Sequence, residues 1–545
     1  MGAIEPVTYP GAGPGTIPGA LARAAARWPD RPALIEGPSR MSWPELAERV
    51  AELARFFVAE GVRPGERIAV LAPNTWHWVV AALGVLSAGA ALVPVSTRFT
   101  ATETLDVLHR CRATALVLPR EFLGRDRLAE LRAAGLDHTA VRTVLRTPTP
   151  TTPGESGFSP GRVGDSDTPG GPTTLDWADI PARAAHVSPH RAATLAAESH
   201  PDQVADILFT SGTTGRSKGA CSSHAQALGV ASAWAECAEL TEADRYLVVN
   251  PFFHSFGYKA GILACLLTGA TLLPVAVFDA ARTLALIERE RITVLPGPPT
   301  LFRSLLDSPA RREYDLSSLR VAVTGAANVP VALVEQMRAE LGFEQVLTGY
   351  GLTEAVVATM CRPGDDPRTV ARSCGRAAAG FEVRIAEPDA GGVGEVLLRG
   401  PNLMLGYLDD PAATAEAVDP AGWLHTGDIG RLDERGYLSI TDRLKDMYIC
   451  GGFNVYPAEV EQHLARLPGV AESAVVGVPD ARLGEVGRAY LVPSPGARLS
   501  EERVLAFCRE RLAGFKVPRQ VVFRAELPRN AGGKVLKTAL RAESV

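Results

Sequence analysis

Short apolar runs alternate with longer amphipathic stretches through the first part of the chain. The apolar runs at residues 67–72 and 91–95 predict buried strands, and the periodic stretches at residues 44–60 and 76–88 predict helices. Ser42 precedes the first of these helices and is followed three residues later by a glutamate, a pattern that caps a helix. Because strands that alternate with helices form parallel sheets covered by helices, the sequence predicts an α/β fold.

The same alternation continues after residue 200. The pattern predicts further strands at residues 204–209, 245–249, 271–275, 293–295, 320–324 and 345–349, and helices at residues 222–239 and 280–291. Between the two α/β regions, residues 147–174 are crowded with Pro, Gly, Ser and Thr. Such a composition cannot build a core, so this segment is predicted to be a flexible surface insertion.

Beyond residue 380 the pattern changes to short strands separated by turns. Runs at residues 381–385, 394–399, 430–433 and 436–441 predict a small subdomain like a β-barrel or a sandwich. A helix that opens at Pro457, strands at residues 471–478 and 521–523 and a helix near residues 500–512 predict a compact α+β unit. We therefore expect a large N-terminal domain of stacked α/β subdomains over residues 1–442, a linker over 443–446 and a small C-terminal domain over 447–545.

Length, charge and cysteine content narrow the function classes. A chain of 545 residues can form several domain-sized units and a large cleft. Its net charge of −5, from 56 basic and 61 acidic residues, provides no basic surface for nucleic acid or an anionic membrane, and favours small polar ligands. The eight cysteines are scattered without Cys-x-x-Cys pairs, which fits reduced thiols in a cytoplasmic protein and argues against a zinc site.

Neither the N-terminal residues nor the longest apolar stretch indicates a membrane protein. The N-terminal residues lack the basic and apolar segments of a signal peptide. The longest apolar stretch, residues 78–95, contains Ser87 and Pro94, and so predicts a buried helix that runs into a strand and not a membrane span.

The most informative stretch follows the strand at residues 204–209. It combines glycines, which bring backbone N–H groups close to anionic oxygens, with short hydroxyl donors and one lysine. The candidates are Thr210, Ser211, Gly212, Thr213, Thr214, Gly215, Ser217, Lys218 and Gly219. We call residues 210–219 the phosphate loop, since this composition suits an oligophosphate.

Two other interpretations of the phosphate loop stay open from the residues alone. A loop of this composition is often only a connection between elements. Residues 215–219 also match the G-x-S-x-G pattern of hydrolases with Ser217 as nucleophile, although six residues separate the strand end at Phe209 from Arg216. The common P-loop is excluded, because Lys218 is followed by Gly219 and not by a hydroxyl residue.

Four later stretches carry candidate chemistry, each with a purely structural alternative. Residues 250–259 place His254 among aromatic residues, which equally fits core packing. Gly325, Ala326 and Ala327 lack bulk, so a flat ring can lie against their backbone. Residues 350–354 combine Tyr350, which a purine can stack on, with Glu354, a carboxylate suited to magnesium already bound to phosphates. Asp428, at the end of residues 422–428, is a candidate for bonding the vicinal hydroxyls of a ribose.

Taken together, these stretches resemble the acyl-adenylate-forming superfamily of acyl-CoA synthetases, adenylation domains and luciferases. The resemblance extends from about Ala20 to Lys537 and rests on five motifs in order: the phosphate loop and residues 350–354, 425–428, 442–446 and 532–534. It implies an enzyme in which a carboxylate attacks the α-phosphorus of ATP to give an acyl-adenylate, followed by thiol attack from coenzyme A. The expected cofactors are ATP, Mg²⁺ and coenzyme A.

The resemblance also implies residue roles. Lys534 bridges the carboxylate and the α-phosphate, Glu354 and Thr214 hold magnesium, and the phosphate loop holds the departing phosphates. The adenine rests between Gly325 to Ala327 and the Gly349, Tyr350, Gly351 and Thr353 segment, and Asp428 and Arg443 take the ribose. The acid pocket is lined by His254, Phe256, Gly257, Lys259 and Thr324, and His254 is also a catalytic candidate. The small C-terminal domain rotates about Lys445 and brings Gly451 and Gly452 to the pantetheine arm of coenzyme A.

The nature of the acid is the least determined expectation. Residues 250–269, 293–300 and 445–462 resemble bacterial CoA ligases of sterol-ring breakdown, which implies a bicyclic indane-type propanoate. Alternatives are a fatty or aromatic acid, a carrier protein in place of coenzyme A, a serine hydrolase that uses Ser217, and a silent nucleotide-binding module. A homodimer is left open.

Overall fold

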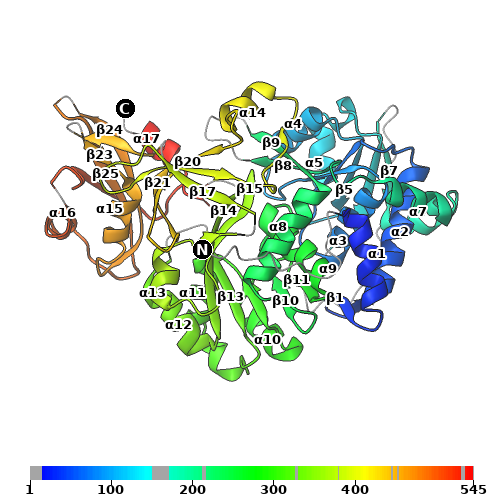
Figure 1. Ribbon diagram of the computed structural model, residues 1–545, viewed down its shortest axis with the longest axis horizontal. Helices are drawn as coiled ribbons and strands as arrows, with labels where there is room; N and C mark the ends of the chain where they lie inside the picture. Colours follow the sequence, from blue (N-terminus) through cyan, green and yellow to red (C-terminus); the bar gives the residue numbers. More distant parts are fainter. Residues whose placement is uncertain are drawn as a thin grey trace. The chain divides into compact units, whose positions relative to one another are not determined.

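The computed structural model describes residues 15–149, 171–210, 217–325, 329–378, 380–443, 446–450, 453–480, 482–512, 514–529 and 534–543. The chain divides into two compact units (Figure 1). The N-terminal unit contains Met1–Glu382 and Arg399–Val418, and the C-terminal unit contains Val383–Leu398 and Asp419–Val545.

Two mixed sheets form the framework of the N-terminal unit. In the described part of the chain, the first has nine strands, in the order β16 (Arg376–Ala377), β15 (Ala355–Met360), β14 (Gln345–Leu352), β13 (Val321–Gly325), β12 (Val294–Pro296), β10 (Arg245–Val248), β11 (Thr271–Pro274), β1 (Pro32–Glu36) and β2 (Ser39–Ser42). The second, counted over the same residues, has eight, in the order β19 (Gly406–Tyr407), β9 (Lys218–Ser223), β8 (Val204–Thr210), β4 (Ala91–Pro94), β3 (Arg67–Val70), β5 (Ala115–Pro119), β6 (Thr143–Thr147) and β7 (Thr173–Asp176).

Helices surround these sheets, and α1, α2 and α7 lie side by side (Figure 1). The α-helices are α1 (Ile17–Arg27), α2 (Trp43–Ala59), α3 (Trp76–Ser87), α4 (Ala101–Cys111), α5 (Arg127–Ala133), α6 (Ile180–Ala184), α7 (Pro189–Glu198), α8 (His224–Cys237), α9 (Ala264–Thr268), α10 (Ala280–Glu290), α11 (Pro299–Asp307), α12 (Val331–Leu341), α13 (Pro367–Arg372) and α14 (Pro411–Ala417). The short 3₁₀ helices are η1 (Leu136–His138), η2 (Trp177–Asp179) and η4 (Pro309–Glu313), and η3 (Phe256–Leu263) is a π-helix.

The predicted α/β fold is confirmed. The strands on both sides of β3 run parallel to it, and β10 to β14 form a second parallel run. Ser42 caps α2 as expected: its hydroxyl accepts from Glu45 N, and the Glu45 carboxylate accepts from Ser42 N. The apolar stretch at residues 78–95 is α3 followed by β4, both buried, and no helix in the described ranges is long and apolar enough to cross a membrane.

The predicted start of one helix is wrong. The sequence pattern starts a helix at residue 222, whereas the residues after the phosphate loop return as strand β9 and α8 begins at His224. The reason is that β9 pairs antiparallel with β8, with Asp206 opposite Ser222, so tertiary pairing overrides the local helical pattern. The predicted insertion at residues 147–174 lies mostly outside the described residues, between β6 and β7.

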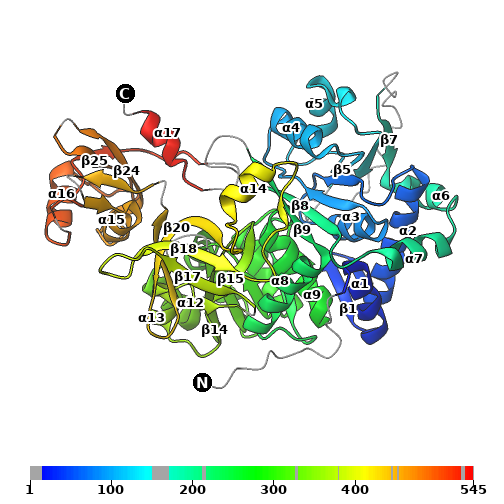
Figure 2. The same cartoon turned by 45° about the horizontal axis from the view of Figure 1, so that its top comes forward.

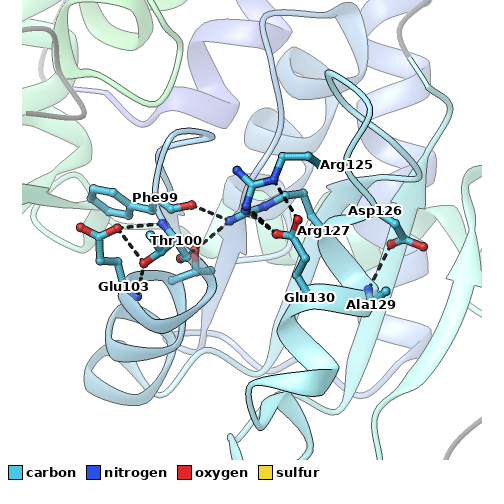
Figure 3. A network of polar contacts seen from close by, with 9 residues as sticks. Phe99, Thr100, Glu103, Arg125, Asp126, Arg127, Ala129 and Glu130 are labelled. Carbon is cyan, nitrogen blue, oxygen red and sulfur yellow. Dashed lines mark hydrogen bonds and ion pairs between the residues drawn. The ribbon is translucent and has the colours of Figure 1, made fainter.

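A polar network fixes the start of α4 next to α5 (Figures 2 and 3). Thr100 and Glu103 form a capping box at the N-terminus of α4. The buried Arg127 guanidinium donates to the Phe99 carbonyl oxygen at 2.7 Å and pairs with Glu130 at 2.7 Å, while Arg125 pairs with the same carboxylate at 2.8 Å. The network therefore orients α4, whose last turn carries Arg110 beside the phosphate loop.

The C-terminal unit holds the two remaining sheets. Over the described residues, one has four strands in the order β17 (Glu382–Ala386), β18 (Gly394–Arg399), β20 (Leu424–Leu432) and β21 (Leu438–Arg443). The other, within those same ranges, is five-stranded: β23 (Phe453–Val455), β22 (Tyr448–Cys450), β25 (Gly484–Pro493) and β24 (Val470–Asp480), with β26 (Gln520–Phe523) beside β25. Its helices are α15 (Pro457–Leu464), α16 (Glu501–Arg509) and α17 (Lys537–Ala542).

This grouping differs from the domain boundary expected at residue 442. The four-stranded sheet belongs to the C-terminal unit, because helix α15 contacts β21 and so joins the sheet to the α+β elements. Helix α15 lies beside β24 and β25 (Figure 2), and the core in this unit includes the buried residues Tyr448, Val460 and Tyr490. The predicted hinge motion at residues 443–446 stays a prediction.

All eight cysteines are free thiols, and seven of them are buried. Burial raises the pKa of Cys111, Cys221, Cys237 and Cys508 to about 11. No group of three or more His, Cys, Asp or Glu side chains in the described ranges is arranged to hold a metal ion. The seven buried cysteines therefore act as small apolar core residues.

Glu36 is a carboxylate whose burial links the stability of the N-terminal unit to pH. Burial raises its pKa to about 7, although its carboxylate accepts a hydrogen bond from Trp76 N. Because the folded state binds this proton more tightly than the unfolded chain, unfolding free energy falls as pH rises from about 4.5 to about 7 and stays low above that. Glu36→Gln should therefore stabilise the protein at pH 8 by up to about 3 kcal/mol and change it little at pH 4.5. Thermal unfolding at both pH values tests this, and an equal gain at the two would contradict it.

Candidate functional site

The phosphate loop joins two neighbouring antiparallel strands. Thr210 ends β8, Lys218 starts β9, and the two residues pair across the ladder. The Thr210 hydroxyl donates to the Lys218 carbonyl oxygen at 3.3 Å and ties the base of the loop together. Ser211, Gly212, Thr213, Thr214 and Gly215 lie outside the described residues, so their predicted contacts with phosphate are untested. The loop leaves β8 at its carboxyl end, the edge at which α/β sheets bind ligands.

Arg110 on α4 holds the exit of this loop and was missed from the sequence. Its guanidinium donates to the Ser217 carbonyl oxygen and lies 3.4 Å from Ser217 Oγ. A guanidinium cannot accept a proton at neutral pH, so it cannot serve as the base that a nucleophilic serine requires. This environment does not favour the hydrolase alternative, and it adds one more cation beside the predicted phosphate site.

A tyrosine links the phosphate loop to the predicted magnesium ligand. The Tyr407 hydroxyl donates to Glu354 Oε1 at 2.7 Å, and Lys218 Nζ lies 4.9 Å from the centroid of the same ring. Tyr407 is in β19, where it pairs with Ala220 of β9. Burial, then the Glu354 carboxylate, raises the Tyr407 pKa well above its usual value, so the hydroxyl stays a proton donor. The structure thus places Lys218 over the ring of Tyr407 and Glu354 at its hydroxyl.

The predicted adenine segment forms the hairpin between β14 and β15. Tyr350 and Gly351 lie in β14, while Thr353 and Glu354 make the turn. A Cβ on Gly351 would lie 2.6 Å from Val357 N, so only glycine fits this strand pairing. Gly325 and Gly349 lie opposite each other in β13 and β14. Ala326 and Ala327 fall outside the described residues, and adenine binding stays a prediction.

The expected acid-binding residues lie on the segment around η3. His254 is exposed and its Nδ1 accepts from Phe256 N at 3.2 Å, while Phe256 packs edge-on against Trp234 at 4.7 Å between centroids. Gly257 has no free space, because a Cβ there would lie 2.2 Å from the Pro251 carbonyl oxygen. Glycine at this position allows the backbone of η3 to lie close to the backbone of Asn250 and Pro251.

The two other pocket candidates are buried. The Thr324 side chain makes no hydrogen bond to any residue that the structure describes, so it has a hydroxyl that a ligand can satisfy. Lys259 is 1% exposed, and its ammonium pairs with Asp206 inside the unit. This geometry does not favour direct contact between Lys259 and an acid.

In the C-terminal unit, the ribose candidate has a fixed backbone. Asp428 is buried in β20 opposite Arg443 of β21. Thr426 holds this strand: its hydroxyl accepts from Asp428 N at 3.1 Å and donates to the Val396 carbonyl oxygen at 2.7 Å. Lys445, Gly451 and Gly452 lie outside the described residues, and their hinge and pantetheine roles stay predictions.

Lys534 is exposed in the same unit. Arg529 and Val535 form an isolated antiparallel bridge, and Lys534 directly precedes Val535. The role of Lys534 between the carboxylate and the α-phosphate stays a prediction.

Magnesium fits the donor groups that the structure describes. Glu354 offers one carboxylate, with Oε1 already bonded to the neutral hydroxyl of Tyr407. Mg²⁺ is commonly held by one or two carboxylates together with substrate phosphates and water, and does not need an all-protein cage. A single carboxylate beside a phosphate loop therefore matches its preference.

Comparisons with known proteins agree on one family. Residues 21–408 match the AMP-binding enzyme family and residues 459–534 match the AMP-binding enzyme C-terminal domain. The 3-[(3aS,4S,7aS)-7a-methyl-1,5-dioxo-octahydro-1H-inden-4-yl]propanoyl:CoA ligase of Rhodococcus jostii (strain RHA1) is 57% identical over 97% of this chain and 99% of its own. The ligase of that name from Mycobacterium tuberculosis (strain ATCC 25618 / H37Rv) is 56% identical over 96% and 98%. The crystal structure of ATP-bound MatB from Rhodopseudomonas palustris is 30% identical, with a TM-score of 0.82 over 97% of this chain and 99% of that one.

Proposed function

The chain belongs to the AMP-binding enzyme family, and we propose that it is an AMP-forming carboxylic acid:CoA ligase whose acid is a bicyclic indane-type propanoate. The observation that supports this substrate is the sequence identity of 57% to the Rhodococcus jostii ligase, over nearly the whole of both chains. A propanoate of that kind is the acid that the sequence resemblance assigns to sterol-ring breakdown. The eight free thiols and the need for ATP and coenzyme A fit a cytoplasmic enzyme.

The first half-reaction joins two anions, so charge neutralisation is its main requirement. The substrate carboxylate attacks the α-phosphorus of ATP, an acyl-adenylate forms and pyrophosphate leaves. Lys534 neutralises the carboxylate and the α-phosphate, while the phosphate loop and Lys218 hold the departing phosphates. Magnesium, when bound by Glu354 and Thr214, supplies positive charge to those phosphates. Arg110 and Tyr407 act through their neighbours, since they fix Ser217 and Glu354.

The second half-reaction is attack of the coenzyme A thiol on the acyl carbon. Thioester forms and AMP leaves. Asp428 and Arg443 hold the ribose of the adenylate, and the adenine lies along Gly325 and Tyr350. Rotation about Lys445 removes Lys534 and brings Gly451 and Gly452 to the pantetheine arm, where the absence of side chains leaves room for it.

Product analysis tests this function. The purified protein is incubated with ATP, magnesium and coenzyme A, together with the indane-type propanoate, a fatty acid of similar carbon number or an aromatic acid. We expect AMP, pyrophosphate and the indane-type thioester, with kcat/KM for that acid at least about tenfold above the others. Inorganic phosphate in place of pyrophosphate, or turnover without ATP, would contradict the ligase assignment. Preference for the fatty or aromatic acid would contradict the substrate alone.

A further inference from the structure

Two opposite charges are buried together in the N-terminal unit. Lys259 Nζ lies 3.0 Å from Asp206 Oδ1, and the two side chains are 2% and 0% exposed. The same ammonium donates a hydrogen bond of 2.7 Å to Ser222 Oγ. We call Asp206, Ser222 and Lys259 the buried triad. The Lys259 ammonium thus contacts both other members of the triad inside the protein.

The triad connects two segments that are far apart in the sequence. Asp206 lies on β8, four residues before Thr210 at the start of the phosphate loop, and Ser222 lies opposite Asp206 on β9, after the loop. Lys259 lies on η3, five residues after His254. One ammonium therefore joins both strands that flank the phosphate loop to the segment of the proposed acid pocket.

Stability alone does not explain such a group. The desolvation of two charges offsets most of their attraction, so buried ion pairs contribute little to folding and a well-packed apolar trio would serve as well. Burial raises the pKa of Asp206, and the Lys259 ammonium and the Ser222 hydroxyl oppose that rise. What a buried ion pair does provide is a definite geometry, because each charge must keep its partner.

The residue type supports the same interpretation. Among the 56 basic residues of the chain, six are lysines: Lys218, Lys259, Lys445, Lys516, Lys534 and Lys537. All other basic residues are arginines, including most of those in surface ion pairs. A compact ammonium with three donors can contact Asp206 and Ser222 at once in a closed space, whereas a planar guanidinium needs more room. Lys259 lies in the π-helix η3, a geometry common at functional sites, and its ammonium reaches Ser222 on β9.

We propose that the buried triad positions the phosphate loop relative to the acid-binding segment, so that ATP and the carboxylate meet in a reactive geometry. Asp206, Ser222 and Lys259 are positioning residues, and the inference rests on the proposed ligase function. Misplacement of the reacting groups by about 1 Å is enough to lower a rate about 10²-fold. Loss of the triad should therefore lower kcat of acyl-adenylate formation more than it changes the KM for ATP or for the acid. It should not affect thioester formation, because that step does not use the departing phosphates.

Two adjacent serines allow a matched test. Ser222→Ala removes a member of the triad, whereas Ser223→Ala removes the N-cap of α8, whose hydroxyl accepts from Gln226 N. For Ser222→Ala we expect kcat of pyrophosphate release to fall about tenfold, with both KM values and the rate of thioester formation from preformed acyl-adenylate within about twofold. For Ser223→Ala we expect a lower melting temperature and an unchanged ratio of the two half-reactions.

The charged pair provides a second variant. The double variant Asp206→Asn with Lys259→Met leaves no unpaired charge, so the protein should fold and keep the thioester half-reaction. Its adenylation should be at least about tenfold slower than that of the unmodified protein. Recovery of adenylation in this double variant, or equal loss of both half-reactions in Ser222→Ala, would overturn the positioning role. If the unmodified protein itself forms no acyl-adenylate from any acid, the ligase function fails and not the triad.

Discussion

Replacing Lys534 with alanine should lower the rate of acyl-adenylate formation at least about 10³-fold and leave thioester formation from preformed acyl-adenylate within about twofold. The reason is electrostatic: two anions must approach, and Lys534 is the proposed cation between them, whereas the second half-reaction joins a thiol to an already activated acyl group. Pyrophosphate release measures the first step, and thioester mass measures the second.

Lys537 supplies the control for this prediction. It lies in the same unit, three residues further on, and its ammonium pairs with Glu461 at 2.8 Å. Lys537→Ala should lower stability by no more than about 1 kcal/mol. It should leave the ratio of the two half-reactions unchanged. Equal loss of both half-reactions in Lys534→Ala would contradict both the bridging role and the rotation of the C-terminal domain.

Replacing Glu354 with glutamine should lower adenylation about 10²- to 10³-fold at a fixed magnesium concentration. Glutamine keeps the size of the side chain and an oxygen that can accept from Tyr407, so the loss reports the missing negative charge. Because the carboxylate is the proposed protein ligand of Mg²⁺, the variant should also require more magnesium for half-maximal rate. Initial rates over a magnesium titration test both effects.

Tyr407→Phe separates the charge of Glu354 from its orientation. It keeps the carboxylate and removes the hydroxyl that donates to Oε1 at 2.7 Å. We expect a loss of about tenfold, smaller than that of Glu354→Gln, since the ligand remains but is less well held. A loss in Tyr407→Phe without any in Glu354→Gln would show that the tyrosine, and not the carboxylate, is needed.

Local signals predicted much of the fold. The capping box at Ser42, the buried strands and the helix that opens at Pro457 all depend on residues a few positions apart, and each is confirmed. The failed boundary at residue 222 had no local signal, because β9 exists only through its pairing with β8. The grouping of the four-stranded sheet likewise depends on the distant contact between α15 and β21.

The same distinction holds for the candidate site. The phosphate loop, Glu354 and Lys534 could be predicted because glycines, hydroxyls and charges occur together in short motifs. Arg110 and Tyr407 belong to no such motif, and their roles come from contacts with Ser217 and Glu354 that only the tertiary fold provides. Lys259 shows the reverse case, since the family resemblance implied a ligand contact that its burial does not favour.

The burial of the cysteines bears on chemical selectivity. An acyl-adenylate is an electrophile that reacts with any accessible thiolate. A thiol with a pKa of about 11, as burial gives Cys111, Cys221, Cys237 and Cys508, is ionised in about one molecule in a thousand at pH 8. These four sulfurs are thereby poor competitors of coenzyme A, and their acylation should be slow even when the intermediate waits for its acceptor.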